Sequence, residues 1–155
     1  MGQQLFITPG PATWTPSNDG LTDGQFYTVA CISFGGNGET GGGGGSALAR
    51  QSFVVGTSTT PLHLNVSAAV GDPSWFSTDG GTTHHVEAET GQNAGGDIAG
   101  AGGLAANSIG AYLQNGGAGG NGSTVNAVGG GGGSGAGDNT DGNNGTASSG
   151  TTPGV

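Results

Sequence analysis

The chain of 155 residues carries little charge, and almost none of it is positive. It has no lysine and a single arginine, Arg50, against ten acidic residues, so its formal net charge is −9 at pH 7. Proteins that bind nucleic acids neutralise phosphates with lysine and arginine, so this composition argues against a nucleic-acid partner. An anionic membrane surface would repel the chain for the same reason. The simplest role for the acidity is to keep the protein soluble.

Long apolar runs are also lacking. No run approaches the ~20 residues that a helix needs to cross a bilayer. The first ten residues, MGQQLFITPG, contain neither the basic region nor the apolar region of a secretory signal peptide. We therefore expect a protein that is made and folded in a cytoplasm, without a signal peptide and without a membrane partner.

Cysteine occurs once, at Cys31, so an internal disulfide is excluded. Its surroundings, YTVACISF, are apolar and β-branched, which predicts a buried residue in a strand. The motifs of common enzymes are missing as well: no Gly-x-Ser-x-Gly elbow follows a strand, and no Gly-Lys-Ser/Thr follows a glycine run. We expect no catalytic residues and no cofactor, and we interpret the protein as a non-enzyme.

Metal ligands are sparse. His85, Glu87 and Glu89, next to His84, would share one face of a strand with side chains ~7 Å apart, which is not typical of structural zinc. Polar residues exposed to solvent or at an interface are the simpler interpretation.

A second acidic segment, GDNTDGNNG at 137–145, carries Asp138 and Asp141. It does not match a calcium-binding EF-hand loop, because Ser148 stands where the bidentate glutamate belongs. Turns explain this segment more simply, so we predict no metal site.

Glycine is what the chain has in abundance. There are 39 glycines, and apolar residues make up only 31% of the chain, so any hydrophobic core must be thin. Such a composition is typical of disorder, because little apolar burial offsets the entropy of the chain. An ordered glycine-rich segment requires a fold in which the missing side chain is itself the structural feature. The length predicts one domain, or a small domain with an extension.

The first 90 residues nevertheless have ordinary β character, with β-branched and aromatic runs between turns. The run FYTVACISF is so continuous that it predicts a strand buried on both faces. In another run Leu62, Leu64 and Val66 alternate inward, and His63, Asn65 and Ser67 outward. We predict Trp14, Trp75 and Phe76 as packing anchors, the last two forming a hydrophobic plug. The strands are expected at 5–8, 13–15, 25–34, 47–55, 61–70 and 83–89.

The composition changes near residue 90. We predict a β-rich anchoring portion at 1–90, which includes the glycine run 35–45, and a glycine-rich portion at 91–155. In NGGAGGNG, residues 115–122, glycine recurs every third residue in two overlapping sets. A polyproline II helix has three residues per turn, so this spacing leaves whole faces bare and lets neighbouring helices approach closely. The predicted fold is therefore mostly β plus polyproline II: a small β-sheet portion followed by a glycine-rich polyproline II bundle or sandwich. A flexible linker is the alternative.

One apolar segment, LAANSIGAYLQ at 104–114, interrupts the glycines. It is expected to form a short helical turn or a loop that plugs the end of the bundle, and packing explains it better than a ligand site. Tyr112, Leu113 and Ile109 are the candidate residues for contact with a host surface or an interface, since receptor contacts often employ aromatic side chains.

Several landmarks occur in an order that resembles a known class of proteins. Trp14 and Pro16 form a Trp-x-Pro motif at the start of the matching region, and a buried strand ends directly in a glycine run. GGGGGSALAR follows at 41–50 and Ser-Trp-Phe-Ser at 74–77. Together these features, over residues 12–145, resemble the glycine-rich domains of virion proteins of tailed phages, such as tail-fibre tip adhesins and fibre proteins of the cyanophage type. The resemblance implies a glycine-rich sandwich of polyproline II helices whose loops contact the host surface.

Three functions remain open. The first is a phage virion protein of the fibre or adhesin type that recognises a host surface glycan or an outer-membrane protein. The second is a purely architectural capsid decoration or head-fibre attachment protein, whose residues 1–90 dock onto the particle. An ice-binding protein is the third, but its flat face of Thr or Ala is missing. The expected location is the virion and the expected partners are other virion proteins, with homo-oligomerisation left open.

Overall fold

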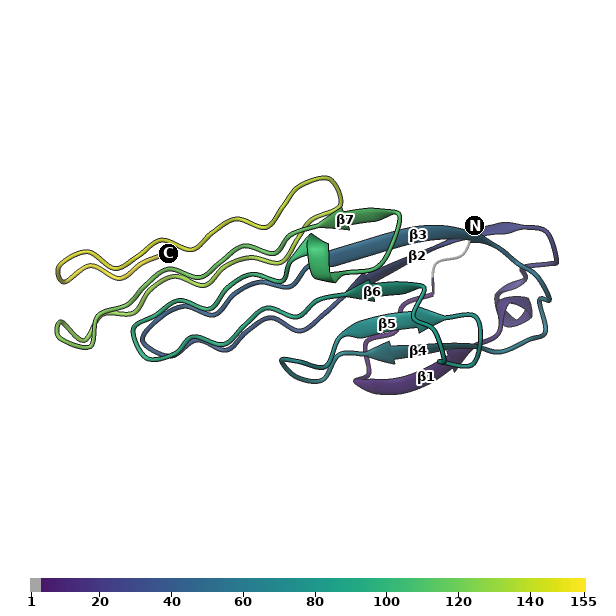
Figure 1. The fold of residues 1–155 in the computed structure, drawn as a ribbon, viewed down its shortest axis with the longest axis horizontal. Helices are drawn as coiled ribbons and strands as arrows, with labels where there is room; N and C mark the ends of the chain where they lie inside the picture. Colours follow the sequence, from purple (N-terminus) through teal and green to yellow (C-terminus); the bar gives the residue numbers. More distant parts are fainter. Residues whose placement is uncertain (1–3) are drawn as a thin grey trace.

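The computed structural model describes residues 4–155, which are mostly β and contain almost no helix. One antiparallel sheet has the strand order β1-β4-β5-β6 and the other β2-β3-β7 (Figure 1). The first sheet consists of β1 (Gly10–Trp14), β4 (Leu62–Val66), β5 (Ser74–Ser77) and β6 (Val86–Ala88). The second consists of β2 (Phe26–Ile32), β3 (Leu48–Val54) and β7 (Tyr112–Gln114). Two short 3-10 turns, η1 (Pro16–Asp19) and η2 (Ala105–Asn107), complete the elements, and no helix within 4–155 is long and apolar enough to span a membrane.

The hydrophobic core lies between the two sheets. β2 and β3 pack across β5 and β6, and the aromatic rings of Tyr27, Phe53 and Phe76 meet at centroid distances of 5.5–6.1 Å. The buried members of this cluster are few and mostly small: Cys31, Ala49, Leu62, Leu64, Phe76, Val86 and Ala88. The predicted burial of Cys31 in a strand is confirmed.

Four of the expected strand regions contain strands, β2, β3, β4 and β6, each shorter than predicted. The expected strand at 5–8 is wrong, because residues 4–9 contain no strand and the chain starts to pair with β4 only at Gly10. β1 overlaps the expected strand at 13–15 only at its end. Trp75 and Phe76, predicted to form a hydrophobic plug, lie in the strand β5 (Ser74–Ser77), which pairs with β4 and β6.

The prediction that the strand around Cys31 is buried on both faces is wrong. Phe26 is 74% and Ile32 55% exposed, whereas the alternate residues Tyr27, Val29 and Cys31 face the core. An antiparallel sheet in a two-layer sandwich has one covered face, so every second side chain of β2 faces outward.

The alternation expected along β4 is confirmed for Leu62 and Leu64, which are buried. Ser67, expected to face outward, is buried instead. It lies just beyond the end of β4, where its hydroxyl accepts a hydrogen bond from the Phe34 N–H and its own N–H donates to Ser74 Oγ. These local hydrogen bonds compensate the burial of a polar residue.

The glycine-rich parts form extended segments that run side by side and project from one end of the sandwich (Figure 1). These segments contain no helix and almost no strand pairing. They are joined by backbone hydrogen bonds at every third residue: the N–H groups of Gly116, Gly119 and Gly122 donate to the carbonyls of Gly103, Gly100 and Asp97 at 2.8–2.9 Å. A β ladder repeats every two residues, so this spacing distinguishes the array from a sheet. We call these segments, 35–46, 91–103, 115–122, 129–136, 142–148 and 152–155, the glycine array.

Glycine is required in the array for steric reasons. A Cβ atom at Gly116, Gly119 or Gly122 would lie 1.9–2.1 Å from a backbone oxygen of the 35–46 segment. At Gly117 or Gly120 it would lie 1.9–2.0 Å from a backbone oxygen of the 142–148 segment. The two overlapping sets of glycines therefore face two different neighbouring segments, and a side chain fits against neither.

Two connections cross the predicted boundary near residue 90. The N–H groups of Gly42 and Gly45 donate to the carbonyls of Gly120 and Gly117, so the run 35–45 lies within the array. In the other direction, β7 leaves the glycine-rich portion and pairs with β3 in the sandwich. The boundary is thus a change of composition along the chain, and the division into two portions remains a prediction.

Candidate functional site

Four turns lie at the end of the glycine array away from the sandwich, two of them inside the segments 35–46 and 91–103 and two between consecutive segments (Figure 1). They lie at 37–40, 95–98, 123–128 and 149–152, and we call them the distal turns. Three are closed by isolated bridges, Gly95 with Ile98, Ser123 with Val128 and Ser149 with Thr152. The array thereby carries these four turns to one free end of the molecule.

Side chains connect three of the distal turns to one another. Glu39 Oε2 accepts the N–H of Gly96 at 2.7 Å, and Asp97 Oδ2 accepts the hydroxyl of Thr124 at 2.8 Å. The carbonyl of Thr40 also accepts the N–H of Gly130 at 2.8 Å. These contacts join turns that are far apart in the sequence, and they hold the surface in one arrangement.

The surface of the distal turns combines apolar and acidic groups. Val125 is 91% and Ile98 71% exposed. Beside them, a shallow hollow is lined by Glu39, Thr40, Thr124, Ala127 and Gly129. Asp97 Oδ1 is buried and has no hydrogen-bond partner among the described side chains and backbone. The available chemistry is that of methyl groups, hydroxyls and carboxylates, which suits contacts with hydroxyl-rich or cationic groups.

Sequence reasoning did not select the residues of the distal turns. Their signal in the sequence is weak: each turn is a place where larger residues, such as those of STVNAV at 123–128, interrupt the glycines. Ala127 adopts φ +55°, a conformation that residues with a side chain seldom adopt. Nothing in the sequence distinguishes these interruptions from the others, because only their common position at the free end makes them a surface.

The predicted contact residues lie elsewhere, near the sandwich. The ring of Tyr112 in β7 is covered by the guanidinium of Arg50, 4.7 Å from the ring centroid, and its hydroxyl is 2.8 Å from Gln114 Nε2. Leu113 packs against the core, whereas Ile109 is 45% exposed and exchanges two 2.8 Å backbone hydrogen bonds with Glu87. The structure thus brings these residues together around β7, away from the distal turns, and a role in host contact remains a prediction.

The predicted packing anchors have different surroundings. Phe76 is only 2% exposed and belongs to the core. Trp14 packs against that core with its ring edge-on to Tyr27 at 5.2 Å. Trp75 points to the opposite face of the sheet from Phe76, where it stacks on His84 at a centroid distance of 4.4 Å.

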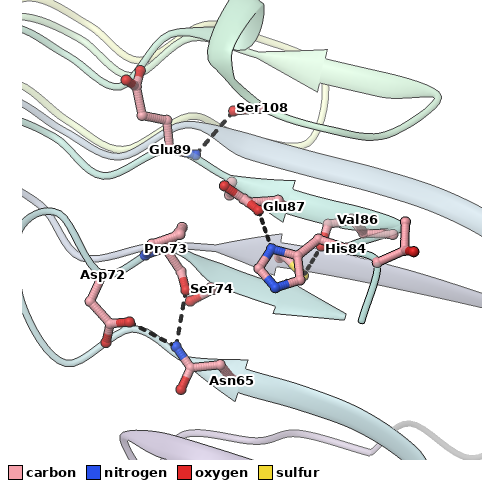
Figure 2. Close-up of polar contacts among 12 residues, drawn as sticks. Asn65, Asp72, Pro73, Ser74, His84, Val86, Glu87, Glu89 and Ser108 are labelled. Atoms are coloured by element: carbon pink, nitrogen blue, oxygen red, sulfur yellow. Dashed lines mark hydrogen bonds and ion pairs between the residues drawn. The ribbon is translucent and has the colours of Figure 1, made fainter. Parts of the chain in front are cut away.

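The side chains of the candidate metal ligands in and near β6 do not all point toward one another; these residues are His84, His85, Glu87 and Glu89. Figure 2 shows His84 Nδ1 directed at Glu87, while the side chain of Glu89 points away. Glu89 accepts hydrogen bonds from the Leu104 N–H and from Asn107 Nδ2, and the ring of His85 packs edge-on against Phe53. Within residues 4–155 no three His, Cys, Asp or Glu side chains gather in a way that could hold a metal ion.

The two aspartates of the 137–145 segment also have separate partners. Asp138 Oδ1 pairs with Arg50 at 2.8 Å, and Asp141 accepts the backbone N–H and the side-chain amide of Asn115 at 2.8 and 3.2 Å. Both aspartates therefore fasten the turn at 137–141 to the neighbouring β3 and to the start of the 115–122 segment.

Comparisons of the chain with family models, with curated proteins and with solved structures found no match.

Proposed function

We propose that this protein is a non-enzymatic structural component of a tailed-phage virion, of the fibre or adhesin type, and that its distal turns recognise the host surface. The observation that carries the proposal is the arrangement of exposed turns at the free end of an array that projects from a small β sandwich (Figure 1). Binding residues are commonly placed on loops that a rigid scaffold positions. The order of landmarks over residues 12–145, which resembles that of phage virion proteins, supports the same class.

The proposal includes the nature of the scaffold: the segments of the glycine array are polyproline II helices packed as a bundle. The three-residue spacing of the backbone hydrogen bonds supports this, since a polyproline II helix completes a turn every three residues. The contacts of Gly116, Gly119 and Gly122 with one neighbouring segment, and of Gly117 and Gly120 with another, fit the same period. Backbone chemical shifts and couplings from NMR test it. Values near φ −75° and ψ +145° across 115–122 are expected, and values of a mobile coil would refute it.

The chemistry of the distal turns indicates the kind of partner. Glu39 and Asp97 provide carboxylates, Thr40 and Thr124 provide hydroxyls, and Ile98 and Val125 provide exposed apolar contact. A host surface glycan, rich in hydroxyls, or an exposed loop of an outer-membrane protein would match these groups. Recognition by many small contacts on a preformed surface requires little ordering on binding.

Binding of the fluorescently labelled chain to host cells tests the proposal. The double variant Ile98→Asp/Val125→Asp adds charge at two exposed positions, so the fold is expected to persist and cell binding to be lost. Ile7→Asp is the matched control, because Ile7 is 73% exposed but lies in the segment that precedes β1. Equal binding by the wild type and the double variant would refute a role for the distal turns.

The architectural alternative, a capsid decoration or head-fibre attachment protein, is favoured by the segment before β1. Leu5 and Ile7 are 70% and 73% exposed there, and they offer an apolar attachment at the sandwich rather than at the distal turns. Gold-labelled antibody on intact virions separates the two functions. Label at the tail tip together with cell binding supports the adhesin. Label only on the capsid, with no cell binding by the isolated chain, would rule it out.

A further inference from the structure

The edge strand β2 carries an unusual surface for a protein of this charge. It borders its sheet, and among residues 4–155 no backbone group outside β3 hydrogen-bonds to the backbone of Phe26–Ile32. Its outward-facing side chains include Phe26 and Ile32, which are 74% and 55% exposed. Exposed edge strands with apolar side chains are ready templates for pairing with another chain.

The other three sheet edges are protected in the ways that natural proteins use. β1 carries Pro11, which has no N–H to offer to a partner strand. β6 exchanges backbone hydrogen bonds between Glu87 and Ile109, and β7 is only three residues long. β2 has seven residues and contains no proline, lysine or other charged residue. Of the described edges, it is the one left open along a long strand.

The hydrogen-bonding groups of β2 that point away from β3 can be assigned from the ladder. The Val55 N–H donates to the Gln25 carbonyl, and the pairing continues in antiparallel register from there. Because alternate residues of an antiparallel strand face opposite neighbours, the backbone of every second residue after Gln25 points to β3. The backbone groups of Phe26, Thr28, Ala30 and Ile32 therefore point to the open edge.

These four residues are self-complementary in one register. In an antiparallel pairing of β2 with the β2 of a second copy, centred on Val29, Phe26 lies opposite Ile32 of the other copy, and Thr28 lies opposite Ala30. Each such pair occurs twice by the two-fold symmetry, as required of an isologous interface. Aromatic side chains opposite β-branched ones are among the favourable cross-strand pairs.

The distribution of charge also favours a second copy of this chain as the partner of β2. The chain carries −9 net charge, so two copies repel each other over most of their surfaces. The open edge and its outward-facing side chains contain no carboxylate, and Arg50, the one charged residue of β2 and β3, is positive and paired with Asp138. A second copy can thus approach along β2 without bringing carboxylates opposite one another.

We infer that β2 is a self-association site, through which two copies of this chain pair antiparallel across the Phe26–Ile32 edge and join their three-stranded sheets into one of six strands. This inference is independent of the proposed function.

Light scattering coupled to size-exclusion chromatography of the 155-residue chain tests it. The wild type is expected to elute with about twice the monomer mass of 14.6 kDa. Ala30→Pro removes an N–H that points to the open edge and is not needed for the pairing with β3, so it is expected to give a monomer that keeps the β circular-dichroism signal. A wild-type monomer at tens of micromolar, or a dimer that persists in a folded Ala30→Pro variant, would overturn the inference.

A charge exchange tests the register. Phe26→Lys or Ile32→Asp alone places a charge opposite an apolar residue twice, and each is expected to weaken dimerisation about tenfold. The double variant Phe26→Lys/Ile32→Asp places opposite charges across both pairs and is expected to recover dimerisation. Val54→Lys, on the same face but in β3, is the matched control and should leave the dimer intact. If the double variant were weaker than both single ones, the proposed register would be wrong.

Discussion

Replacing Gly133 by alanine is expected to destabilise the protein strongly, whereas the same change at the adjacent Gly132 is expected to have little effect. A Cβ at Gly133 would lie 2.0 Å from the carbonyl oxygen of Gly117, but at Gly132 the nearest atom is 3.9 Å away. Neither glycine has a positive φ, so the two substitutions differ in the space available and not in backbone strain. They are also adjacent in the same segment, so the two substitutions have nearly the same surroundings in the unfolded chain.

The magnitude follows from the packing of the segments 115–122 and 129–136. A comfortable contact between carbon and a carbonyl oxygen is ~3.3 Å, so the two segments would have to separate by about 1.3 Å. That movement would break the hydrogen bonds from Gly117 to Ser134 and from Gly120 to Gly131, now 2.9 and 2.7 Å, at about 1 kcal/mol each. Overpacking costs a further ~1–3 kcal/mol. The free energy of unfolding should therefore fall by about 3–5 kcal/mol.

Thermal and urea unfolding of the wild type and the two variants measure this difference. For a chain of this size the midpoint temperature of Gly133→Ala should fall by roughly 6–20 °C. Gly132→Ala should stay close to the wild type or gain up to ~1 kcal/mol, since alanine restricts the unfolded chain. Similar stabilities of the two variants would refute the close packing of the array and with it the steric role of its glycines.

Two further predictions concern the sandwich and the distal turns. Burial raises the pKa of the Cys31 thiol from 9.0 to about 12, with the negative charge of Glu87 adding to the effect, and burial raises the pKa of Tyr27 from 10.0 to about 12. As the pH rises, the unfolded chain therefore loses these protons before the folded protein does. The contribution of the two groups to the free energy of unfolding is fully present below pH ~9 and falls toward pH 12, by up to about 1.4 kcal/mol per pH unit for the thiol. In urea unfolding between pH ~9 and ~12, the free energy of unfolding should fall less for Cys31→Ala than for the wild type. The same dependence on pH in both proteins would contradict the burial of the thiol. Ala127→Gly should raise the free energy of unfolding by about 0.5 kcal/mol, because relief of the positive φ outweighs the greater freedom of glycine in the unfolded chain; a lower melting temperature would show that Ala127 is not strained.

The sequence alone identified several features because they depend on local order. The β-branched and aromatic runs before residue 90 predicted four of the strands, since alternation and composition act over a few neighbouring residues. The three-residue spacing of glycine in 115–122 predicted bare faces, and the close contacts of Gly116 and Gly117 with two different segments agree with that expectation. The burial of Cys31 followed from its apolar surroundings.

Other features could be decided only by tertiary structure. Which face of β2 is covered depends on the second sheet, so Phe26 could not be distinguished from Tyr27 by sequence, although they are neighbours. The segment Ser74–Ser77 is a strand because β4 and β6 lie on either side of it. The distal turns become one surface only when contacts such as that between Asp97 and Thr124 bring distant segments together. Composition and periodicity report on local conformation, whereas neighbours in space depend on how the whole chain packs, and that information is spread over residues far apart in the sequence.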